Sequence, residues 1–400
     1  MSGLKNEHVI CISSVDWDPI WTRKQQVMSR LPESNTILYV EPPITLLSPF
    51  KDPSMWKKWR MWFQGLRRLN NNIFLYSPPV VLPFGNKFRL INRLNQWWIS
   101  LFLKKAVKSL NFRNPLLWTY MPNTADLLNS IGDYDMLIYD CVDEHSEYTG
   151  IINKAAMTDM EKDLMVNCDI VFVTARGLYE AKKDLAETIY FLPNAANVEH
   201  FMKAQDPDTP VPDEMAAIPG PVIGFVGVIQ DWIDLDLVKD AAAAHPEWSF
   251  VMIGPVGPGI DVSALKAMPN VHFMGRKDVG DLPRYIKGFD VCINPFKINE
   301  LTDKVSPLKF YEYLASGKPI VSVAMPGVSD FADVVEIAGS SDEFIRGIER
   351  ALSQETPEKL EKRLERAKEN SWESRVEFMS EKIMEKYKHI KLKHDQRRKR

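Results

Sequence analysis

Short apolar runs alternate with amphipathic segments along the first half of the chain. The apolar runs predict strands at 8–15, 36–43, 115–120, 135–142, 169–175 and 188–194, with a strand and loop over 72–84. Helical spacing of apolar positions predicts helices at 21–31, 88–110, 152–167 and 178–185. Strands and helices that alternate at this spacing are typical of βαβ units around a parallel sheet.

A second series of strands and helices follows a proline-rich segment. Residues 205–221 contain five prolines and little apolar periodicity, so we predict a linker over 205–220. Beyond it the pattern predicts strands at 221–229, 248–254, 270–275, 289–296 and 318–324, and helices ending at 244, at 282–287, at 308–316 and from 357 onward.

The sequence therefore predicts an α/β protein with two Rossmann-like domains. We place the first domain at 1–204, the second at 221–370 and a final segment at 371–400. Open sheets of this kind bind ligands at the carboxyl ends of their strands, so we expect a cleft where the strand ends of the two domains face each other.

Composition narrows the class of protein. The chain has 400 residues, of which 45% are hydrophobic and 26% charged, and this excludes a disordered, collagen-like or disulfide-scaffold protein. It contains no apolar run of 18 residues and no signal-peptide pattern at its start, so we expect a cytoplasmic protein. No cysteine lies in a CxxC pair and the histidines lack zinc spacing, so we expect buried thiols and no metal site. The cysteines are Cys11, Cys141, Cys168 and Cys292.

Charge is unevenly distributed although the net charge is only −3. Between Asp52 and Asp126 there are twelve Lys or Arg residues and no acidic residue, and six of the eleven tryptophans lie in the same stretch. The last fifteen residues are also strongly basic. The remainder of the chain is correspondingly acidic.

Tryptophans recur every third residue in part of this basic stretch. On a helix this spacing places a tryptophan edge beside a basic flank, a pattern typical of segments that lie in a membrane interface. Each cation near an anionic leaflet adds about 1 kcal/mol of attraction. Packing into a core and binding of nucleic acid are the alternatives, of which we favour neither. The predicted membrane-surface residues are Trp56, Lys57, Lys58, Trp59, Arg60 and Trp62.

The most informative segment covers residues 306–321. A loop opens a helix there, and the helix ends at a glycine, Gly317, that precedes the next strand. The free N–H groups and the positive dipole end at the start of the helix suit a phosphate, and a lysine there adds a point charge. A carboxylate one turn further along is placed to accept hydrogen bonds from the two hydroxyls of a ribose. The residues concerned are Ser306, Pro307, Leu308, Lys309 and Glu312.

This segment resembles that of GT-B glycosyltransferases, in particular glycosyltransferase family 4, in which a helix bearing Glu precedes A-x-G-x-P-V-V. Residues 192–201 resemble the family's P-N-G-V-D motif, residues 270–275 its N-V-x-F-L-G strand, and residues 371–373 the S-W-E that opens its last helix. Further motifs resemble the teichuronic-acid-biosynthesis type of bacterial surface-polysaccharide transferase. They lie at 17–18, 39–42, 139–143, 231–234 and 306–309.

The resemblance implies a GT-B fold whose last helix, 371–400, crosses back to the acceptor-binding first domain. It implies transfer of a sugar from a nucleotide-diphosphate donor, UDP-linked rather than GDP-linked, to a lipid-linked or growing cell-surface polysaccharide, with retention of configuration and no required metal. The basic stretch then places the enzyme on the inner face of the cell membrane, with an anionic membrane surface as partner and no nucleic acid. A sugar-nucleotide epimerase of the same fold and a catalytically silent scaffold remain alternatives.

The chain departs from the family pattern at two places. Lys304 stands eight residues before Glu312, where family 4 usually has a second Glu that contacts the donor sugar. The basic pair that normally holds the diphosphate is replaced by residues 230–232, Gln-Asp-Trp. We expect Lys304 and Lys309 to restore the positive charge.

Other candidates follow predicted strands. Gly227 would let a phosphate approach the backbone closely, and Arg276 would stack on the nucleotide base. We expect Asp143 or Asp140 to orient or deprotonate the acceptor hydroxyl, because desolvation raises a carboxyl pKa toward a useful range. The catalytic candidates are Asp143, Asp140 and Lys309, and the acceptor-side candidates Asp16 and Asp18.

Overall fold

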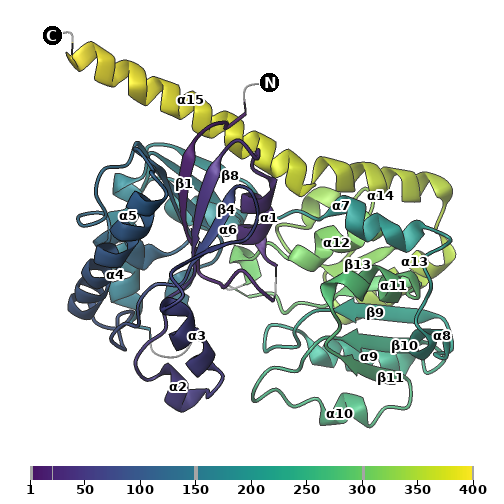
Figure 1. Ribbon diagram of the computed structural model, residues 1–400. Helices are drawn as coiled ribbons and strands as arrows, with labels where there is room; N and C mark the ends of the chain where they lie inside the picture. Colours follow the sequence, from purple (N-terminus) through teal and green to yellow (C-terminus); the bar gives the residue numbers. More distant parts are fainter. Residues whose placement is uncertain (1–2, 20, 148–151, 300–301, 399–400) are drawn as a thin grey trace. The chain divides into compact units, whose positions relative to one another are not determined.

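The computed structural model describes residues 3–19, 21–147, 152–299 and 302–398. Its contacts divide the chain into two units. Unit 1 comprises residues 1–192 and 375–400, and unit 2 comprises residues 193–374. Figure 1 shows the two units, each with its own sheet and helices.

Unit 1 contains an eight-stranded sheet within the described residues, in the order β3-β4-β2-β1-β5-β6-β7-β8. All its neighbouring pairs are parallel except β3 with β4. Several strands, such as Met136–Cys141, are buried along their whole length, which agrees with a parallel sheet that is covered on both faces. The strands are β1 (His8–Ile12), β2 (Thr36–Val40), β3 (Leu66–Arg68), β4 (Ile73–Tyr76), β5 (Leu116–Thr119), β6 (Met136–Cys141), β7 (Ile170–Val173) and β8 (Ile189–Phe191).

Helices flank this sheet. They are α1 (Arg23–Arg30), α2 (Ser48–Lys51), α3 (Met55–Trp62), α4 (Arg89–Ser109), η1 (Pro122–Asp126), η2 (His145–Glu147), α5 (Lys154–Asn167) and α6 (Arg176–Lys182). Ion pairs from Arg89 to Asp159 and Asp163 join α4 to α5.

Unit 2 has a six-stranded parallel sheet within the described residues, in the order β11-β10-β9-β12-β13-β14. The strands are β9 (Val222–Val226), β10 (Ser249–Ile253), β11 (Val271–Gly275), β12 (Val291–Asn294), β13 (Ile320–Val323) and β14 (Glu336–Ala338). The helices are α7 (Val198–Phe201), η3 (Met202–Gln205), α8 (Asp213–Ala216), α9 (Leu235–Ala244), α10 (Ser263–Lys266), η4 (Val279–Asp281), α11 (Leu282–Lys287), η5 (Thr302–Lys304), α12 (Leu308–Ser316), η6 (Ser329–Phe331), α13 (Ser341–Ser353) and α14 (Pro357–Glu369).

The last helix, α15 (Trp372–Arg398), is the long yellow helix in Figure 1. Its first residues belong to unit 2 and it continues in unit 1 from Arg375. In unit 1, Tyr387 donates a hydrogen bond to Asp135 and Lys386 donates one to Thr188. The predicted α/β fold class and the crossing helix are confirmed, whereas residues 399–400 of the basic tail lie outside the described residues.

The proline-rich segment does not connect the two units. Residues 205–220 lie inside unit 2, and the chain passes between the units at 192/193. Lys287 donates hydrogen bonds to the carbonyls of Asp206, Pro207 and Thr209, and Met215 is buried. Proline content correctly indicated irregular backbone there, but backbone carbonyls that bind one lysine hold the segment on its own domain.

Candidate functional site

Loops that follow three strands of unit 2 are tied together at the carboxyl edge of its sheet. The amide of Ile229, after β9, donates to the carbonyl of Pro255, after β10. The amide of Asp234 donates to the carbonyl of Pro295, after β12. Ligands of parallel sheets bind at such an edge, and the sequence candidates for donor binding lie on or beside these loops.

Gly227 directly follows β9 at this edge. A Cβ at this position would lie 2.8 Å from the ring of Phe225, and one at Gly254 would lie 1.8 Å from the carbonyl oxygen of Gly227. Both glycines are therefore required by the packing of the corner. Gly227 and Gly254 are both partly exposed at this turn.

Helix α12 begins at the same edge without a side-chain cap. Pro307 occupies its N-cap position and no side chain accepts from its first amides. Asn194 binds the loop before the helix, because its amide donates to Ser306 Oγ at 3.1 Å and its Nδ2 donates to the Ser306 carbonyl at 2.9 Å. Asn194 Oδ1 is buried without a hydrogen-bond partner among the described residues. The amide of Phe310 donates to the carbonyl of Pro307 at 3.2 Å, whereas those of Leu308 and Lys309 have no hydrogen-bond acceptor within the described residues and are available to an anion.

Glu312 is buried one turn into α12, with 6% of its surface exposed. Its Oε2 accepts a hydrogen bond from Lys309 Nζ at 2.6 Å. The next residue, Tyr313, accepts a hydrogen bond from the amide of Val226 at 2.6 Å, which ties α12 to the end of β9. The helix ends at Gly317, whose φ of +71° is the expected left-handed C-terminal cap. The structure thus brings Glu312, Lys309 and the helix start together.

Two further candidates for binding the nucleotide-sugar donor lie outside α12. Lys304 ends η5, just before α12, and is half-buried. Arg276 is exposed and follows Gly275, the last residue of β11, which has a φ of +65°. Both side chains follow a strand or loop at the carboxyl edge of the sheet.

Asp140 is not available as a general base, which corrects the sequence prediction. It is fully buried on β6, and both its oxygens accept a hydrogen bond from Arg23 Nε, at 3.0 and 2.9 Å. Arg23 also donates to the carbonyl of Leu192 at 3.1 Å. A buried carboxylate that is satisfied by a guanidinium joins α1 to the sheet and holds the end of β8 in place.

Asp143 lies just beyond β6 and is half-buried, close to two buried bases. Burial lowers the pKa of Lys24, against the opposing charges of Asp143 and Asp140. Burial likewise lowers the pKa of His145, and Asp143 again opposes the shift. Asp143 therefore lies in a polar, partly desolvated environment just beyond the carboxyl end of β6.

The acceptor-side candidates and part of the basic stretch line one pocket. Asp16 pairs with Lys58 of α3 at 2.6 Å, and Asp18 is exposed beside it along the chain. Glu41, beyond β2, pairs with Arg67 and also accepts a hydrogen bond from Ser77. The pocket, of about 980 Å³, is lined by these residues and by α3. Two sets of candidates that the sequence analysis treated separately are therefore neighbours.

The basic, tryptophan-rich segment forms helix α3, but its tryptophans are not equally exposed. Trp56 is 47% exposed, whereas Trp59 and Trp62 are half-buried. Trp62 packs edge-on against Phe102 of α4, with ring centroids 5.6 Å apart. Lys57 and Arg60 are exposed, while Lys58 is engaged by Asp16. A uniform tryptophan edge is thus wrong, because aromatic packing against α4 covers part of it.

Helix α4 has an inverted distribution of polar and apolar side chains over its first three turns. Asn92, Asn95 and Gln96 are buried, while large apolar side chains one helix face away are exposed. Most exposed large apolar side chains of the described residues lie between Leu46 and Leu101. Five of them lie on one side of α4, and we call this surface the outer face of α4: Leu90, Leu94, Trp97, Trp98 and Leu101. The sequence analysis missed it, although the spacing of these residues gave a signal.

No described helix is both long enough and apolar enough to span a membrane. No cluster of three or more His, Cys, Asp or Glu side chains is arranged to hold a metal ion in the part of the chain that the structure describes.

Comparison with known proteins agrees with these observations. Residues 220–354 match the family described as glycosyl transferases group 1. TuaH of Bacillus subtilis, which is named as a glycosyltransferase of teichuronic acid biosynthesis, is 30% identical over 235 residues. That match covers 55% of this chain and 58% of TuaH, so the chain matches little more than half of this relative's length.

Solved structures resemble the whole chain. Sucrose-phosphate synthase of Thermosynechococcus elongatus has a TM-score of 0.66 at 14% identity, covering 95% of this chain and 98% of its own. An E. coli trehalose-6-phosphate structure bound to UDP-2-fluoro glucose scores 0.67 at 11% identity, covering 95% and 99%. Anabaena HepE with UDP-glucose scores 0.64 at 13% identity, covering 94% and 99%. The resemblance seen in the sequence is thus confirmed, since residues 220–354 match the group 1 glycosyl transferases and the whole chain has the fold of GT-B glycosyltransferases.

Proposed function

We propose that this protein transfers a sugar from a nucleotide-diphosphate donor to a lipid-linked or growing cell-surface polysaccharide. The observation that carries the proposal is the start of α12. There a buried carboxylate, Glu312, lies one turn from uncapped helical amides, inside the segment that matches the group 1 glycosyl transferases. The helix start suits a diphosphate, and the nearby carboxylate suits the hydroxyls of a ribose.

The donor is a UDP-sugar rather than a GDP-sugar in this proposal. Anabaena HepE was solved with UDP-glucose and the E. coli structure with UDP-2-fluoro glucose, and both share this fold. Glu312 would accept hydrogen bonds from the ribose hydroxyls, and Arg276 would stack on the base. The Lys309–Glu312 pair supports this role, because it orients the carboxylate before the ribose arrives.

Transfer itself depends on the departing diphosphate. The acceptor hydroxyl oxygen forms a bond to the anomeric carbon, the bond from that carbon to the diphosphate breaks, and the proton passes to a base. The helix start at Ser306–Leu308, with Lys304 and Lys309, would stabilise the charge that develops on the diphosphate. Asp143 would receive or orient the proton. This scheme uses no metal ion, and it would retain the anomeric configuration if the acceptor oxygen attacks the anomeric carbon from the face that the diphosphate leaves.

The acceptor would be held by unit 1 at a membrane surface. Support comes from the exposed cations Lys57 and Arg60, from Trp56 and from the outer face of α4. Apolar side chains that remain exposed beside cations suit an anionic bilayer. A second copy of this chain is a less suitable partner for this surface, since two such basic faces would repel each other. TuaH, named for teichuronic acid biosynthesis, supports a surface-polysaccharide product.

Calorimetric titration with UDP, GDP, ADP and TDP tests the donor site. We expect saturable binding of UDP, weakened about 10- to 100-fold in Glu312→Ala, because a hydrogen bond to a charged group contributes about 1.5–3 kcal/mol. Glu361→Ala is the matched control, since Glu361 is an exposed glutamate of α14. Failure of every nucleotide to bind, or equal affinities in the two variants, would contradict the proposal.

A further inference from the structure

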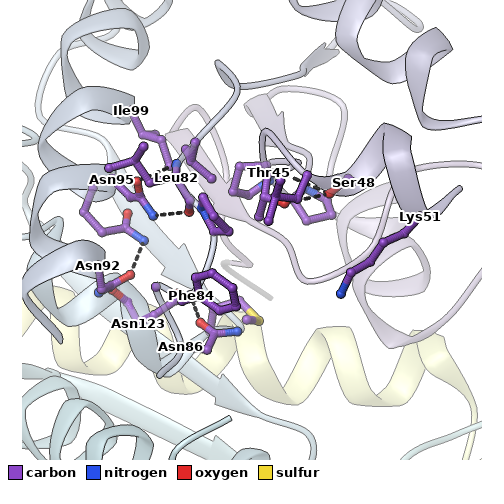
Figure 2. A pocket seen from close by; sticks show the side chains of 18 residues that line it. Thr45, Ser48, Lys51, Leu82, Phe84, Asn86, Asn92, Asn95, Ile99 and Asn123 are labelled. Carbon is purple, nitrogen blue, oxygen red and sulfur yellow. Dashed lines mark hydrogen bonds between the residues drawn. The ribbon is translucent and has the colours of Figure 1, made fainter. Parts of the chain in front are cut away.

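A second pocket of unit 1 is bounded by α4 and by the segments that follow β2, β4 and β5. Its volume is about 430 Å³, which suits one or two sugar rings. Figure 2 shows the labelled amide, hydroxyl and aromatic side chains around it. Of its lining residues, the sequence analysis noted only Pro42, as the end of the motif at 39–42.

Amide side chains on the α4 wall are fixed by their own hydrogen bonds. Asn95 accepts from the amide of Leu82 and donates to its carbonyl, both at 2.9 Å. Asn92 donates to the carbonyl of Asn123 at 2.9 Å and to Asp126 at 2.7 Å. These bonds orient the wall before any ligand binds, which reduces the entropy lost on binding.

The same network leaves donors and acceptors available toward the pocket. Gln96 Nε2 donates to Asn92 at 3.4 Å, and Asn123 Nδ2 donates to Asn86 Oδ1 at 3.1 Å. Within the described residues, Gln96 Oε1, Asn123 Oδ1 and Asn86 Nδ2 have no hydrogen bond. A mixture of uncharged donors and acceptors matches sugar hydroxyls, each of which both donates and accepts.

Phe84 adds an aromatic ring to this wall, and its backbone conformation is strained. Its φ is +69°, in the left-handed region that bulky residues rarely occupy. The amides of Lys87 and Phe88 both donate to its carbonyl at 3.0 Å and hold the turn. The ring nevertheless remains 41% exposed, so burial does not compensate the strain. Strain that is kept without a packing gain points to a function of the ring.

Helix α4 separates two environments. Its buried amides face the pocket, while Leu90, Leu94 and Trp97 of its outer face are exposed at 70%, 50% and 54%. A molecule with a sugar head and a hydrocarbon chain would satisfy both surfaces, because hydroxyls pair with amides and hydrocarbon covers apolar side chains.

We propose that this pocket binds a sugar ring of the membrane-anchored acceptor, with Phe84 stacked on the ring and Gln96, Asn86 and Asn123 bound to its hydroxyls. The hydrocarbon part lies along the outer face of α4. The negative face of an aromatic ring attracts the C–H face of a sugar. The identification of this molecule as the acceptor rests on the proposed function, whereas the binding site itself does not.

Titration with octyl glycosides below their micelle concentrations tests the site in the full chain. The panel comprises the β-D-glucoside, galactoside, N-acetylglucosaminide and glucuronide, with octyl phosphocholine as a chain-only comparison. We expect saturable binding of at least one glycoside. Failure of all four to bind, or equal binding of octyl phosphocholine, would overturn the proposal.

Phe84→Gly separates function from structure. Glycine adopts positive φ without strain, so this variant should keep or raise the melting temperature while weakening glycoside binding at least tenfold. Phe63→Ala is the control, because Phe63 is an exposed phenylalanine outside this pocket. Gln96→Leu should weaken glycoside binding by a similar factor, because it removes an amide side chain that binds a sugar hydroxyl. Unchanged binding in both Phe84→Gly and Gln96→Leu would overturn the assignment.

The two proposals fail in different ways. UDP binding is measured on the same samples and depends on unit 2, where Glu312 lies. Glycoside binding without UDP binding would contradict the proposed donor site and leave the sugar site standing. UDP binding without glycoside binding would overturn only the sugar site.

Discussion

Several buried ionisable side chains in unit 1 are paired with partners that lie far away along the chain. Arg23 satisfies Asp140, and Lys182 lies between Glu144 and Glu161, at 3.3 and 2.6 Å. The pairs Arg23–Asp140 and Lys182–Glu144 join a helix to the carboxyl edge of the sheet, and Lys182–Glu161 joins α6 to α5. The sequence correctly placed carboxylates at this edge. Whether a carboxylate can act as a base depends on its ion-pair partner, which the sequence did not show.

His145 gives a prediction on pH. Burial lowers its pKa below the ordinary value of 6.5, so between 6.5 and the lowered value the unfolded chain binds a proton that the folded chain does not. Stability is then fully present above pH 6.5 and falls as pH decreases, by up to about 1.4 kcal/mol per pH unit. Urea unfolding at pH 7.5, 6.5 and 5.5 should show a flatter dependence in His145→Gln. The same dependence in both proteins would contradict this cause.

At the scale of elements, α4 shows why periodicity alone was not enough. A helix was correctly predicted at 88–110, and it spans Arg89–Ser109. Apolar spacing indicates a face, but not whether protein or another phase covers it. Here the amides are inside and Leu94 and Trp97 outside. The absence of acidic residues around α4 was the sequence signal that pointed to an unusual surface.

The outer face of α4 gives a second prediction. Leu90→Gln combined with Leu94→Gln should change the free energy of unfolding by less than about 1 kcal/mol, because exposed substitutions cost about 0.5 kcal/mol or less each. The same double variant should reduce co-sedimentation with vesicles of phosphatidylcholine and phosphatidylglycerol several-fold. By contrast, Leu103→Ala on the buried face should cost about 2–5 kcal/mol. Undiminished co-sedimentation of the double variant would remove α4 from the membrane argument.

At the scale of the whole molecule, α15 belongs to both units. It starts in unit 2, where the amide of Trp372 donates to the carbonyl of Ala196, and from Arg375 onward it completes unit 1. Met379, Ile383 and Tyr387 are buried there. Unit 1 is therefore assembled from residues at both ends of the chain.

This arrangement predicts which unit responds to a core substitution. Ile383→Ala should destabilise unit 1 by about 2–5 kcal/mol, which lowers its melting temperature by roughly 4–20 °C. Differential scanning calorimetry with UDP identifies the transition of unit 2, because bound ligand raises it. Ile348→Ala, in α13 of unit 2, should instead lower the UDP-sensitive transition. A shift of the UDP-sensitive transition by Ile383→Ala would contradict the division.

Local patterns determined much of this protein. Buried apolar runs fixed the parallel strands, because a strand covered on both faces must be apolar throughout. The segment 306–317 fixed an uncapped helix start, Glu312 and a left-handed glycine, since these features depend on a few adjacent residues. The edge strands β3 and β14 escaped prediction because their sequences, Leu-Arg-Arg and Glu-Ile-Ala, do not form an apolar run.

Only the tertiary structure decided which of these features are available to a ligand. It paired Asp140 with Arg23, 117 residues away, and placed Asn194 beside Ser306, 112 residues away. It also kept 205–220 on unit 2 and turned the amides of α4 inward. Such outcomes depend on contacts between distant residues, whose energies no local pattern contains.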